Sequence, residues 1–311
     1  MRGNFIKDIG ELGLVDRIRK KEKPGSSVIK GIGDDCAVLE FSKDKYMLFA
    51  CDMLIEGRHF LLKGKDKGQI ATAYQIGHKA MAVNISDVAA MGGVPKHALV
   101  SIGLPRNLKI DFLDQLYKGI RDVSGKFHVN IVGGDANECD KVVIDVSIIG
   151  FVEKNKLVTR SNAKAGDSIF VTGRLGGSRH GKHLNFTPRL AEARYLVENF
   201  KINSMIDISD GLAIDLYRLL KESKRGAYLF ANFIPLSESA KNLNSALSDG
   251  EDFELLFTVS QKEARRLTSA GGRRRKFNFT RIGVIADGDA GMNILYKDKV
   301  LPLEPTGYAH F

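Results

Sequence analysis

Two adjacent carboxylates follow a pair of glycines in the stretch Gly31-Ile32-Gly33-Asp34-Asp35. Glycines allow a ligand to approach the backbone closely. At an effective dielectric of about 20, two like charges ~4 Å apart repel by roughly 4 kcal/mol, so a cation between them would be stabilising. An exposed turn is the alternative, because Gly and Asp are ordinary turn residues. Taken alone, the stretch favours a turn over a metal site.

Other aspartates recur where predicted strands end or predicted helices begin. With the first pair they form one set: Asp34, Asp35, Asp52, Asp87, Asp135, Asp207 and Asp210. Few histidines or cysteines lie near them, and all-oxygen ligands suit hard cations such as Mg²⁺ or Ca²⁺. Because they are spread through the chain, they fit a phosphate site with several Mg²⁺ ions better than an EF-hand. Phosphoryl transfer is mostly positioning and charge neutralisation, so the residues predict a two-domain, Mg²⁺-dependent enzyme that uses a nucleotide.

The composition is that of an ordinary globular protein, with 43% hydrophobic and 27% charged residues among 311. This length exceeds one typical core, so we expect two domains, 1–152 and 153–311. No apolar run approaches the ~20 residues of a membrane span, and the first residues lack a signal-peptide core, so we expect no membrane partner. Three widely spaced cysteines favour a reducing, cytoplasmic setting over a disulfide framework.

The net charge of +10 is compatible with nucleic acid or with small anionic substrates. The Lys and Arg residues are scattered and are not striped with aromatic residues, so we expect no nucleic-acid partner. The one dense basic run, 273–276, is most simply a solvated loop after two glycines. The charge therefore favours small anionic substrates.

The elements that must position the carboxylates follow from apolar periodicity. In the first half we predict helices over 5–20, 70–91 and 111–124, and strands over 36–41, 45–51, 97–104, 129–132 and 142–150. In the second half we predict strands over 169–172, 227–233, 253–259 and 278–285, and helices over 211–222 and 261–270. Asp52 then follows a strand, and α/β sheets tend to place ligands at such carboxyl ends. Asn84 and Asp87 project from one side of a helix amid apolar neighbours, so we expect a buried carboxylate that needs a partner.

One glycine-rich run resembles a nucleotide-binding phosphate loop without completing it. The run GGSRHGKH over 176–183 ends in His183, where a Ser or Thr hydroxyl would bind Mg²⁺. We therefore do not expect a phosphate loop here. We also do not expect His180 and His183 to bind zinc, because no cysteine lies nearby.

Three further segments have competing explanations. Ser209 or Asp210 could simply cap the helix over 211–222. A cap would explain one of these residues but not two carboxylates three positions apart beside an apolar strand. The Lys- and Gly-rich segment 62–69 is predicted to be disordered or a lid, and the aromatic tail 306–311 is predicted either to dock or to be a free end.

Motifs along nearly the whole chain resemble those of the thiamine-monophosphate kinase family, of the superfamily that includes aminoimidazole-ribonucleotide synthetase. They are, in order, GIGDD at 31–35, Asp52 with EGRHF at 56–60, KAMAVNISDVAAMGG at 79–93, GGD at 133–135, TRS at 159–161, IDISDG at 206–211, GEDFEL at 250–255 and GYAHF at 307–311. Because they occur in order over nearly the whole length, the match is specific. The resemblance implies an α/β (α+β) fold of two domains, each a mixed sheet flanked by helices, in a homodimer.

The resemblance also implies a reaction, in which the γ-phosphate of ATP moves to thiamine monophosphate and gives thiamine diphosphate. The implied Mg²⁺ ligands are Asp34, Asp35, Cys51, Asp52, Asp87, Asp135, Asp207 and Asp210. The implied ATP contacts are Tyr117, Gly134, Asp135, Arg160 and Ser209, and the implied thiamine-monophosphate contacts are His59, Glu251 and Tyr308. No general base is expected, because the acceptor is already an anionic phosphate. Several Mg²⁺ ions and Arg160 would reduce the repulsion between two anions.

Two departures from the family pattern bear on activity. Ala50-Cys51 stands where family members carry Ser or Thr hydroxyls before the aspartate. A thiol is a poor Mg²⁺ ligand, so one metal position would be weakened or would depend on backbone carbonyls. The segment 177–189 is shorter than usual and is predicted to lack a helix, which would alter the second domain and the acceptor pocket.

Sister activities of the superfamily are the main alternatives. Selenophosphate synthetase would need a reactive cysteine near the N-terminus, and none precedes Cys36. The hydrogenase-maturation dehydratase carries a C-terminal cysteine, which the tail 306–311 lacks. Aminoimidazole-ribonucleotide synthetase uses a different acceptor and would not call for the GYAHF tail. A nucleotide-binding protein without turnover is the alternative from another class.

Overall fold

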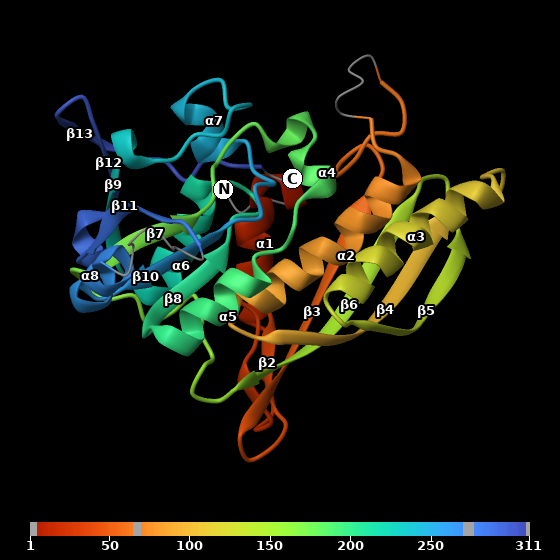
Figure 1. The fold of residues 1–311 in the computed structure, drawn as a ribbon, viewed down its shortest axis with the longest axis horizontal. Coiled ribbons are helices and arrows are strands. Elements are labelled where there is room, and N and C mark those ends of the chain that lie inside the picture. Colours follow the sequence, from red (N-terminus) through yellow and green to blue (C-terminus); the bar gives the residue numbers. More distant parts are fainter. Residues whose placement is uncertain (1–4, 65–69, 270–276, 309–311) are drawn as a thin grey trace.

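The computed structural model describes residues 5–64, 70–269 and 277–308, which form two mixed β-sheets flanked by helices. The first half of the chain builds one sheet and the second half builds the other, and the two stand side by side (Figure 1). The expected mixed α/β architecture is therefore confirmed.

The first sheet has the strand order β1-β2-β3-β6-β4-β5. Its strands β4 and β5 pair in parallel, and the other neighbours pair antiparallel. The strands of this half are β1 (Val28–Lys30), β2 (Ala37–Glu40), β3 (Lys45–Ile55), β4 (Val94–Leu104), β5 (Asn130–Glu138) and β6 (Val143–Glu153). Its helices are η1 (Ile6–Asp8), α1 (Gly10–Arg19), α2 (Ala73–Ala90) and α3 (Ile110–Lys126).

The second sheet has the strand order β13-β12-β9-β11-β7-β10-β8, with β9 and β12 parallel. Its strands are β7 (Ser168–Thr172), β8 (Ile202–Asp207), β9 (Gly226–Phe230), β10 (Leu255–Val259), β11 (Phe279–Ala286), β12 (Met292–Tyr296) and β13 (Lys299–Pro302). The helices of this half are η3 (Ser178–His180), α4 (Lys182–Asn185), α5 (Leu190–Asn199), α6 (Leu212–Ser223), η4 (Ala231–Phe233), α7 (Leu243–Ser248), α8 (Gln261–Ser269) and η5 (Gly288–Ala290).

Helix α2 is the element that contacts both halves. It begins at a capping box, in which the Gln75 amide donates to Thr72 Oγ1 at 3.2 Å and the Thr72 amide donates to Gln75 Oε1 at 2.9 Å. It ends before Gly92, whose φ of +72° suits glycine. The helix packs on β3, β4 and β6 of the first sheet and on α4, α5 and β8 of the second half. Helix α2 therefore runs along the first sheet and reaches elements of the second half (Figure 1).

Helices α2 and α3 cross closely because each carries a glycine at the crossing. A Cβ at Gly77 would lie 1.9 Å from the Leu116 carbonyl oxygen. A Cβ at Gly119 would lie 2.0 Å from the Tyr74 carbonyl oxygen. Any larger side chain would push the helices apart, so these two glycines fix α2 against the first sheet.

The first sheet has a second face that exposes apolar side chains. On β3, Leu54 is buried, whereas Phe49 and Met53 point the other way and are 44% and 50% exposed. Further along the sheet, Leu99 on β4 and Val132 on β5 are 46% and 60% exposed. We call these four exposed side chains and their surroundings the open face of the first sheet.

Two aspartates predicted at strand ends lie inside strands, so this part of the prediction is wrong. Strand β3 continues past Asp52 because it pairs with β6 as far as Ile55. Strand β5 continues past Asp135 because it pairs in parallel with β4 as far as Glu138. Strand length here depends on the partner strand, which local sequence does not encode.

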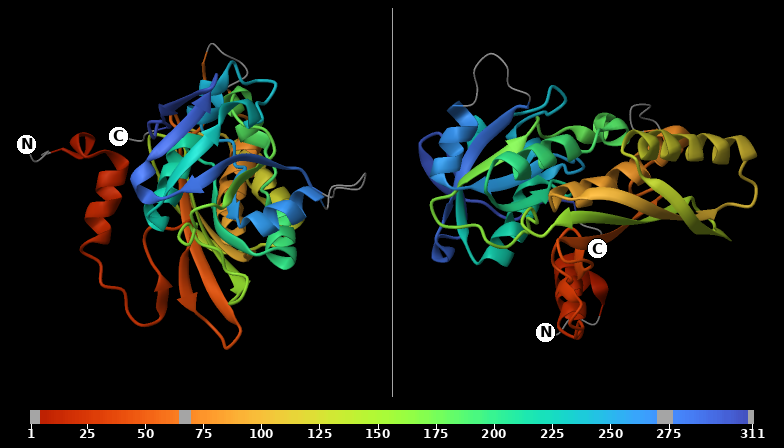
Figure 2. Two further views of the ribbon diagram at one scale, coloured as in Figure 1. Left: turned by 90° about the vertical axis from the view of Figure 1, so that its left-hand side faces the viewer. Right: turned by 60° about the horizontal axis from the view of Figure 1, so that its bottom comes forward.

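The prediction that 177–189 lacks a helix is also wrong, because η3 and α4 lie in it and α5 follows. The predicted helix over 5–20 is represented by η1 and the shorter α1, which stands at the edge of the molecule (Figure 2). Most of the predicted lid over 62–69 lies outside the described residues. In the part of the chain that the structure describes, no helix combines the length and apolarity needed to cross a bilayer.

Candidate functional site

A cavity of about 630 Å³ is lined by residues from both halves of the chain, including residues of α1 in the first half. The predicted site residues that line it are Asp34, Asp35, Cys51, Asp52, His59, Asp87, Arg160, Asp207, Ser209, Asp210, Glu251 and Tyr308. They come from the loop before β2, from β3 and the loop after it, and from α2. The others come from the segment after β6, from the end of β8 and the segment after it, from the loop before β10 and from the C-terminal tail. The structure thus brings together most of the predicted set from positions far apart in sequence.

Three of these carboxylates gather at one point and are called the acidic triad: Asp35, Asp87 and Asp207. One oxygen from each lies within 4.8 Å of the others. Asp87 is on α2 and Asp207 is the last residue of β8. The Ser86 hydroxyl donates to Asp207 Oδ2 at 2.6 Å, which links α2 to the second sheet. The triad is therefore held by elements of both halves.

Burial makes the charged forms of these carboxyl groups costly. The pKa of Asp87 is raised well above its usual value by burial and by the charges of Asp52 and Asp207. Burial and the charge of Asp35 raise the pKa of Asp207, although the hydrogen bond from Ser86 opposes this shift. Burial and the charge of Asp35 also raise the pKa of Asp34 to about 6. A bound cation would relieve this repulsion.

The donor set of this group fits a divalent cation. Asp34 Oδ2 and Asp35 Oδ2 are buried and make no hydrogen bond within the described residues. The nearest cation to the first of them is the Lys30 ammonium, 3.4 Å away. Buried polar atoms without partners are costly. Carboxylate oxygens with free lone pairs, in a set without nitrogen or sulfur, are the ligands that Mg²⁺ and Ca²⁺ prefer.

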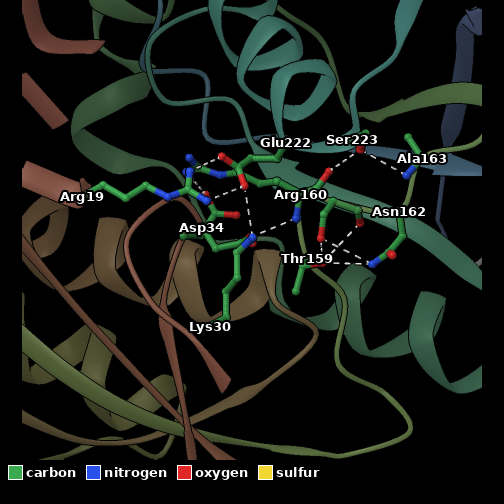
Figure 3. Close-up of polar contacts among 11 residues, drawn as sticks. Arg19, Lys30, Asp34, Thr159, Arg160, Asn162, Ala163, Glu222 and Ser223 are labelled. Carbon is green, nitrogen blue, oxygen red and sulfur yellow. Dashed lines mark hydrogen bonds and ion pairs between the residues drawn. The ribbon is translucent and has the colours of Figure 1, made fainter. Parts of the chain in front are cut away.

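Arg160 contacts both members of the acidic pair Asp34 and Asp35. Its backbone amide donates to Asp34 Oδ1 at 2.9 Å, and its Nη2 donates to Asp35 Oδ1 at 2.6 Å. Burial disfavours the guanidinium charge, but the charge of Asp35 and this hydrogen bond raise the pKa of Arg160 overall. The Arg160 carbonyl accepts from the Ser223 hydroxyl at 2.8 Å, which fixes the segment to α6 (Figure 3).

Helix α1 is tied to α6 along the rim of the cavity. Arg19 Nη1 donates to Glu222 Oε1 at 2.5 Å, and Lys30 Nζ donates to Glu222 Oε2 at 3.1 Å (Figure 3). Further along, Lys221 Nζ donates to Asp16 Oδ2 at 2.6 Å. Each pair is partly exposed and contributes little to stability on its own. Together they place α1 so that it lines the cavity.

The start of α6 shows that Ser209 and Asp210 do not cap this helix. The Asp215 side chain accepts from the backbone amides of Asp210 and Gly211 at 3.0 and 3.1 Å instead. The capping alternative is therefore wrong. Asp210 lines the cavity, where Arg218 Nη1 reaches its Oδ2 at 2.5 Å and Asp215 Oδ1 at 2.7 Å.

Another part of the cavity wall is built around an ionised glutamate. Lys79 Nζ donates to the His59 carbonyl at 2.8 Å and to the Glu251 carboxylate. His183 Nδ1 lies 2.9 Å from Glu251 Oε2. Burial opposes the charge of Glu251, but the hydrogen bond from His183 and the charge of Lys79 lower its pKa to about 2. This carboxylate is therefore charged at neutral pH.

The described part of the C-terminal tail docks on the cavity. The Tyr308 amide donates to the Asp210 carbonyl at 2.9 Å. The Arg179 guanidinium lies 4.5 Å from the centroid of the Tyr308 ring. Docking of the tail is thus confirmed as far as residue 308, and 309–311 lie outside the described residues.

Three predicted site residues do not line the cavity: Tyr117, Gly134 and Asp135. Tyr117 packs against the core of the first sheet from α3. Gly134 and Asp135 are exposed on β5, the edge strand of that sheet. Cys51 lines the cavity, but its side chain and that of Asp52 leave β3 on opposite faces.

Sequence reasoning missed three basic residues in or near the cavity: Lys79, His183 and Arg218. Lys79 lies in a run of apolar helical residues, and this position was a usable signal of a buried charge that needs a partner. The sequence around His183 suggests phosphate or zinc binding and gives no sign of its contact with Glu251. Arg218 follows Asp215 by three positions, the spacing of an ion pair on one helix face.

Two family models match the chain in succession. The model of the AIR synthase related protein, N-terminal domain, matches residues 33–152. The model of the AIR synthase related protein, C-terminal domain, matches residues 150–292. The first match contains Asp35 and Asp87, and the second contains Asp207, so the acidic triad draws on both.

Curated relatives and a solved structure narrow the family further. Thiamine-monophosphate kinase of Buchnera aphidicola subsp. Schizaphis graminum is 34% identical, and the alignment covers 98% of this chain and 99% of that protein. Thiamine-monophosphate kinase of Rhodopirellula baltica is 35% identical over 96% of this chain and 97% of its own. The structure of AaThiL complexed with AMPPCP and TMP superposes with a TM-score of 0.85 at 30% identity, over 100% of both chains. The chain belongs to the thiamine-monophosphate kinase family of AIR synthase related proteins.

Proposed function

We propose that this protein transfers the γ-phosphate of ATP to thiamine monophosphate and so makes thiamine diphosphate. The observation that carries the proposal is the cavity that joins the acidic triad to Arg160 and to the ionised Glu251. Relatives named thiamine-monophosphate kinase align with nearly the whole chain, and AaThiL was solved with AMPPCP and TMP. The acidic triad could hold metal ions, Arg160 could bind phosphate, and the Glu251 carboxylate could bind a cationic acceptor. These three functions suit ATP and thiamine monophosphate.

The chain's own residues would act by positioning and by charge. The acceptor phosphate is anionic at neutral pH, so no general base is needed to create the nucleophile. The obstacle is the approach of two anions, and fixed positive groups reduce their repulsion. Arg160 supplies such a charge, and its contacts with Asp34 and Asp35 hold it in place before substrates bind.

Several Mg²⁺ ions would accompany ATP. The carboxylates that would hold them are Asp34, Asp35, Asp52, Asp87, Asp135, Asp207 and Asp210. When bound, the ions would neutralise and polarise the phosphate oxygens. The buried Asp34 and Asp35 oxygens that make no hydrogen bond within the described residues support this assignment. Cys51 would be the weakest member of the set, because a hard cation prefers oxygen to sulfur.

The remaining residues would bind the two substrates. The thiamine end of the acceptor would be held by His59, Glu251 and Tyr308. A cationic aromatic ring is attracted to the face of a tyrosine and to an ionised carboxylate, and Glu251 is such a carboxylate. ATP would be held by Arg160 and Ser209 in the cavity and by Tyr117, Gly134 and Asp135 outside it.

The protein would be a homodimer formed through the open face of the first sheet. Phe49 and Met53 on β3 and Leu99 on β4, with β6 between these strands, expose large apolar side chains on this face. Exposed apolar surface of this kind marks association sites. Burying that face would remove it from water. Because Gly134 and Asp135 lie on the edge strand outside the cavity, their proposed contacts with ATP depend on the assembled dimer.

The cysteines fit a cytoplasmic enzyme. Cys36 is buried, Cys51 is exposed and Cys139 is half-buried, and all three are free thiols. In an oxidising compartment the exposed Cys51 would be open to disulfide exchange. A reducing compartment would keep it as a thiol.

The test compares three acceptors with the purified protein, ATP and Mg²⁺: thiamine monophosphate, thiamine and aminoimidazole precursors. We expect a new phosphorylated product with thiamine monophosphate alone. A product from an aminoimidazole precursor would favour a sister synthetase. Binding of ATP and thiamine monophosphate without any product would favour a nucleotide-binding protein without turnover.

A further inference from the structure

Lys79 is a lysine with no exposed surface in the described structure, although lysine is among the residues least often buried. It lies in the first half of α2, where His183 of α4 is 2.9 Å from its Nζ. A buried ammonium is costly unless its donors are paired. Burial lowers the pKa of Lys79, against the charge of Glu251.

The partners of Lys79 come from three separate segments. The His59 carbonyl accepts from Nζ at 2.8 Å, the Glu251 carboxylate accepts from it, and His183 Nδ1 lies 2.9 Å from it. An ammonium has three donors, and these three partners account for all of them when His183 Nδ1 carries no proton. His183 Nδ1 also lies 2.9 Å from Glu251 Oε2, and its tautomer decides which contact it makes.

Two of these segments carry the residues proposed to receive the acceptor. His59 lies in the loop after β3, where its ring accepts from the Ile55 amide at 2.9 Å. Glu251 lies in the loop before β10 with a φ of +60°, a conformation that is costly for a residue other than glycine. The Glu251 amide donates to the Ser209 carbonyl at 2.6 Å. Lys79 therefore joins a loop of the first half to a strained loop of the second.

We propose that Lys79 is a positioning residue for the acceptor substrate. It holds the His59 loop and the Glu251 carboxylate at a fixed separation across the boundary between the two halves. The inference rests on the proposed function, because it assigns these two residues to the thiamine end of the acceptor. It predicts that loss of Lys79 weakens binding of thiamine monophosphate and leaves binding of ATP unchanged, since the hydrogen-bond partners of this lysine among the described residues are His59, His183 and Glu251.

The kinetic test compares Lys79→Met with a matched control, Lys182→Met. Lys182 also pairs with a buried carboxylate, Glu254, but it does not line the cavity, and Arg189 still binds Glu254 at 2.6 and 2.7 Å. We expect Lys79→Met to raise KM for thiamine monophosphate by about tenfold or more. KM for ATP should stay within about twofold in both variants. An equal rise in both KM values, or no rise for the acceptor, would overturn the proposal.

A second variant covers the case in which Lys79→Met does not fold. The double variant Lys79→Met/Glu251→Gln removes both charges of the buried pair, so no uncompensated charge is left. Because Glu251 is itself a proposed contact of the acceptor, this variant is compared with Glu251→Gln alone. We expect the double variant to bind thiamine monophosphate more weakly than Glu251→Gln, because the His59 loop has lost its bond to Lys79. Equal affinity of the two variants for the acceptor would overturn the proposal.

A readout without turnover separates this inference from the proposed function. Hydrogen exchange of the substrate-free protein should show faster exchange in peptides covering 56–61 and 249–253 of the folded Lys79 variant, and not in Lys182→Met. If the wild type makes no thiamine diphosphate, the proposed function fails. If both peptides keep wild-type protection, the positioning role fails whatever the wild type catalyses.

Discussion

The guanidinium of Arg160 donates to Asp35 at 2.6 Å, so a residue that follows the first sheet holds a member of the acidic triad. The backbone amide of the same residue holds Asp34 at 2.9 Å. The GIGDD stretch is thus anchored by Arg160 rather than exposed as a simple turn. This contact keeps one cation beside the carboxylates before any metal ion or nucleotide binds.

Replacing Arg160 should impair use of ATP. We expect Arg160→Ala to lower kcat/KM for ATP by roughly 100-fold, because it removes a fixed positive charge at the reacting phosphates. Arg160→Lys should recover only part of this loss, since an ammonium lacks the planar fork of a guanidinium. Steady-state kinetics with ATP as the varied substrate measures both. Arg194→Lys, at a bidentate pair with Glu153 outside the cavity, is the matched control, and near-normal rates for Arg160→Ala would contradict the assignment.

Removing single carboxylates should stop turnover without unfolding the protein. We expect Asp52→Ala and Asp210→Ala to lower kcat by at least roughly 100-fold, since each removes a proposed Mg²⁺ ligand. Circular dichroism should show a folded protein, and a Mg²⁺ titration should show weaker metal dependence than in the wild type. Asp289→Ala, at an exposed position in η5, is the control. Turnover at the wild-type rate in either cavity variant would remove that residue from the metal site.

The metal-free protein should lose stability as pH rises from about 4 to 7. Burial in the folded state and the charge of Asp35 raise the pKa of Asp34 from 3.8 to about 6. Burial also raises the pKa of Asp215 from 3.8 to about 7, although the charge of Arg218 opposes this shift. The folded state then binds more protons than the unfolded state in this window, so the free energy of unfolding falls with rising pH. Folding lowers the pKa of Glu251 from 4.5 to about 2. This residue therefore makes the free energy of unfolding rise with pH, but only below about pH 4.5.

Mg²⁺ should reverse this dependence, because it binds the deprotonated carboxylates. The measurement is urea unfolding at pH values from 5 to 8, once with a chelator and once with Mg²⁺. A rise of stability with pH in the chelated protein would contradict the unfavourable burial of these acids.

The open face of the first sheet should hold the dimer together. Met53→Asp and Leu99→Asp place a charge on surfaces that are 50% and 46% exposed in one chain, so they should yield monomers. Light scattering coupled to gel filtration measures the mass. Phe233→Asp is the control, because Phe233 is 63% exposed on η4 of the second half. A monomeric wild type would exclude the dimer.

Much of the fold could be predicted from local pattern. Helix α2 has apolar residues at helical spacing, a capping box at Thr72 and glycines at its end, and the prediction of 70–91 differs little from the observed bounds. Helix α5 was missed although Ala193, Leu196 and Val197 stand at helical spacing. The ends of β3 and β5 could not be predicted, because pairing with β6 and β4 determines them.

Part of the candidate site could also be predicted from the sequence, and part could not. The residues of the acidic triad could be predicted, because each is an aspartate next to glycines or to an apolar segment, and both features can be read from the local sequence. The contact of Lys79 with Glu251 could not be predicted, because it depends on how two segments far apart in the sequence pack together. The contact of Arg218 with Asp210 could not be predicted either, because it depends on the path of the turn before α6. Asp135 shows the converse, as a motif residue that the fold of one chain leaves outside the cavity.

The most direct test of the central claim is phosphorus NMR of the purified protein with ATP, Mg²⁺ and thiamine monophosphate. We predict that the monophosphate signal decreases while the two coupled signals of thiamine diphosphate and those of ADP increase in equal amounts. Release of inorganic phosphate from ATP with the thiamine monophosphate signal unchanged would contradict the account.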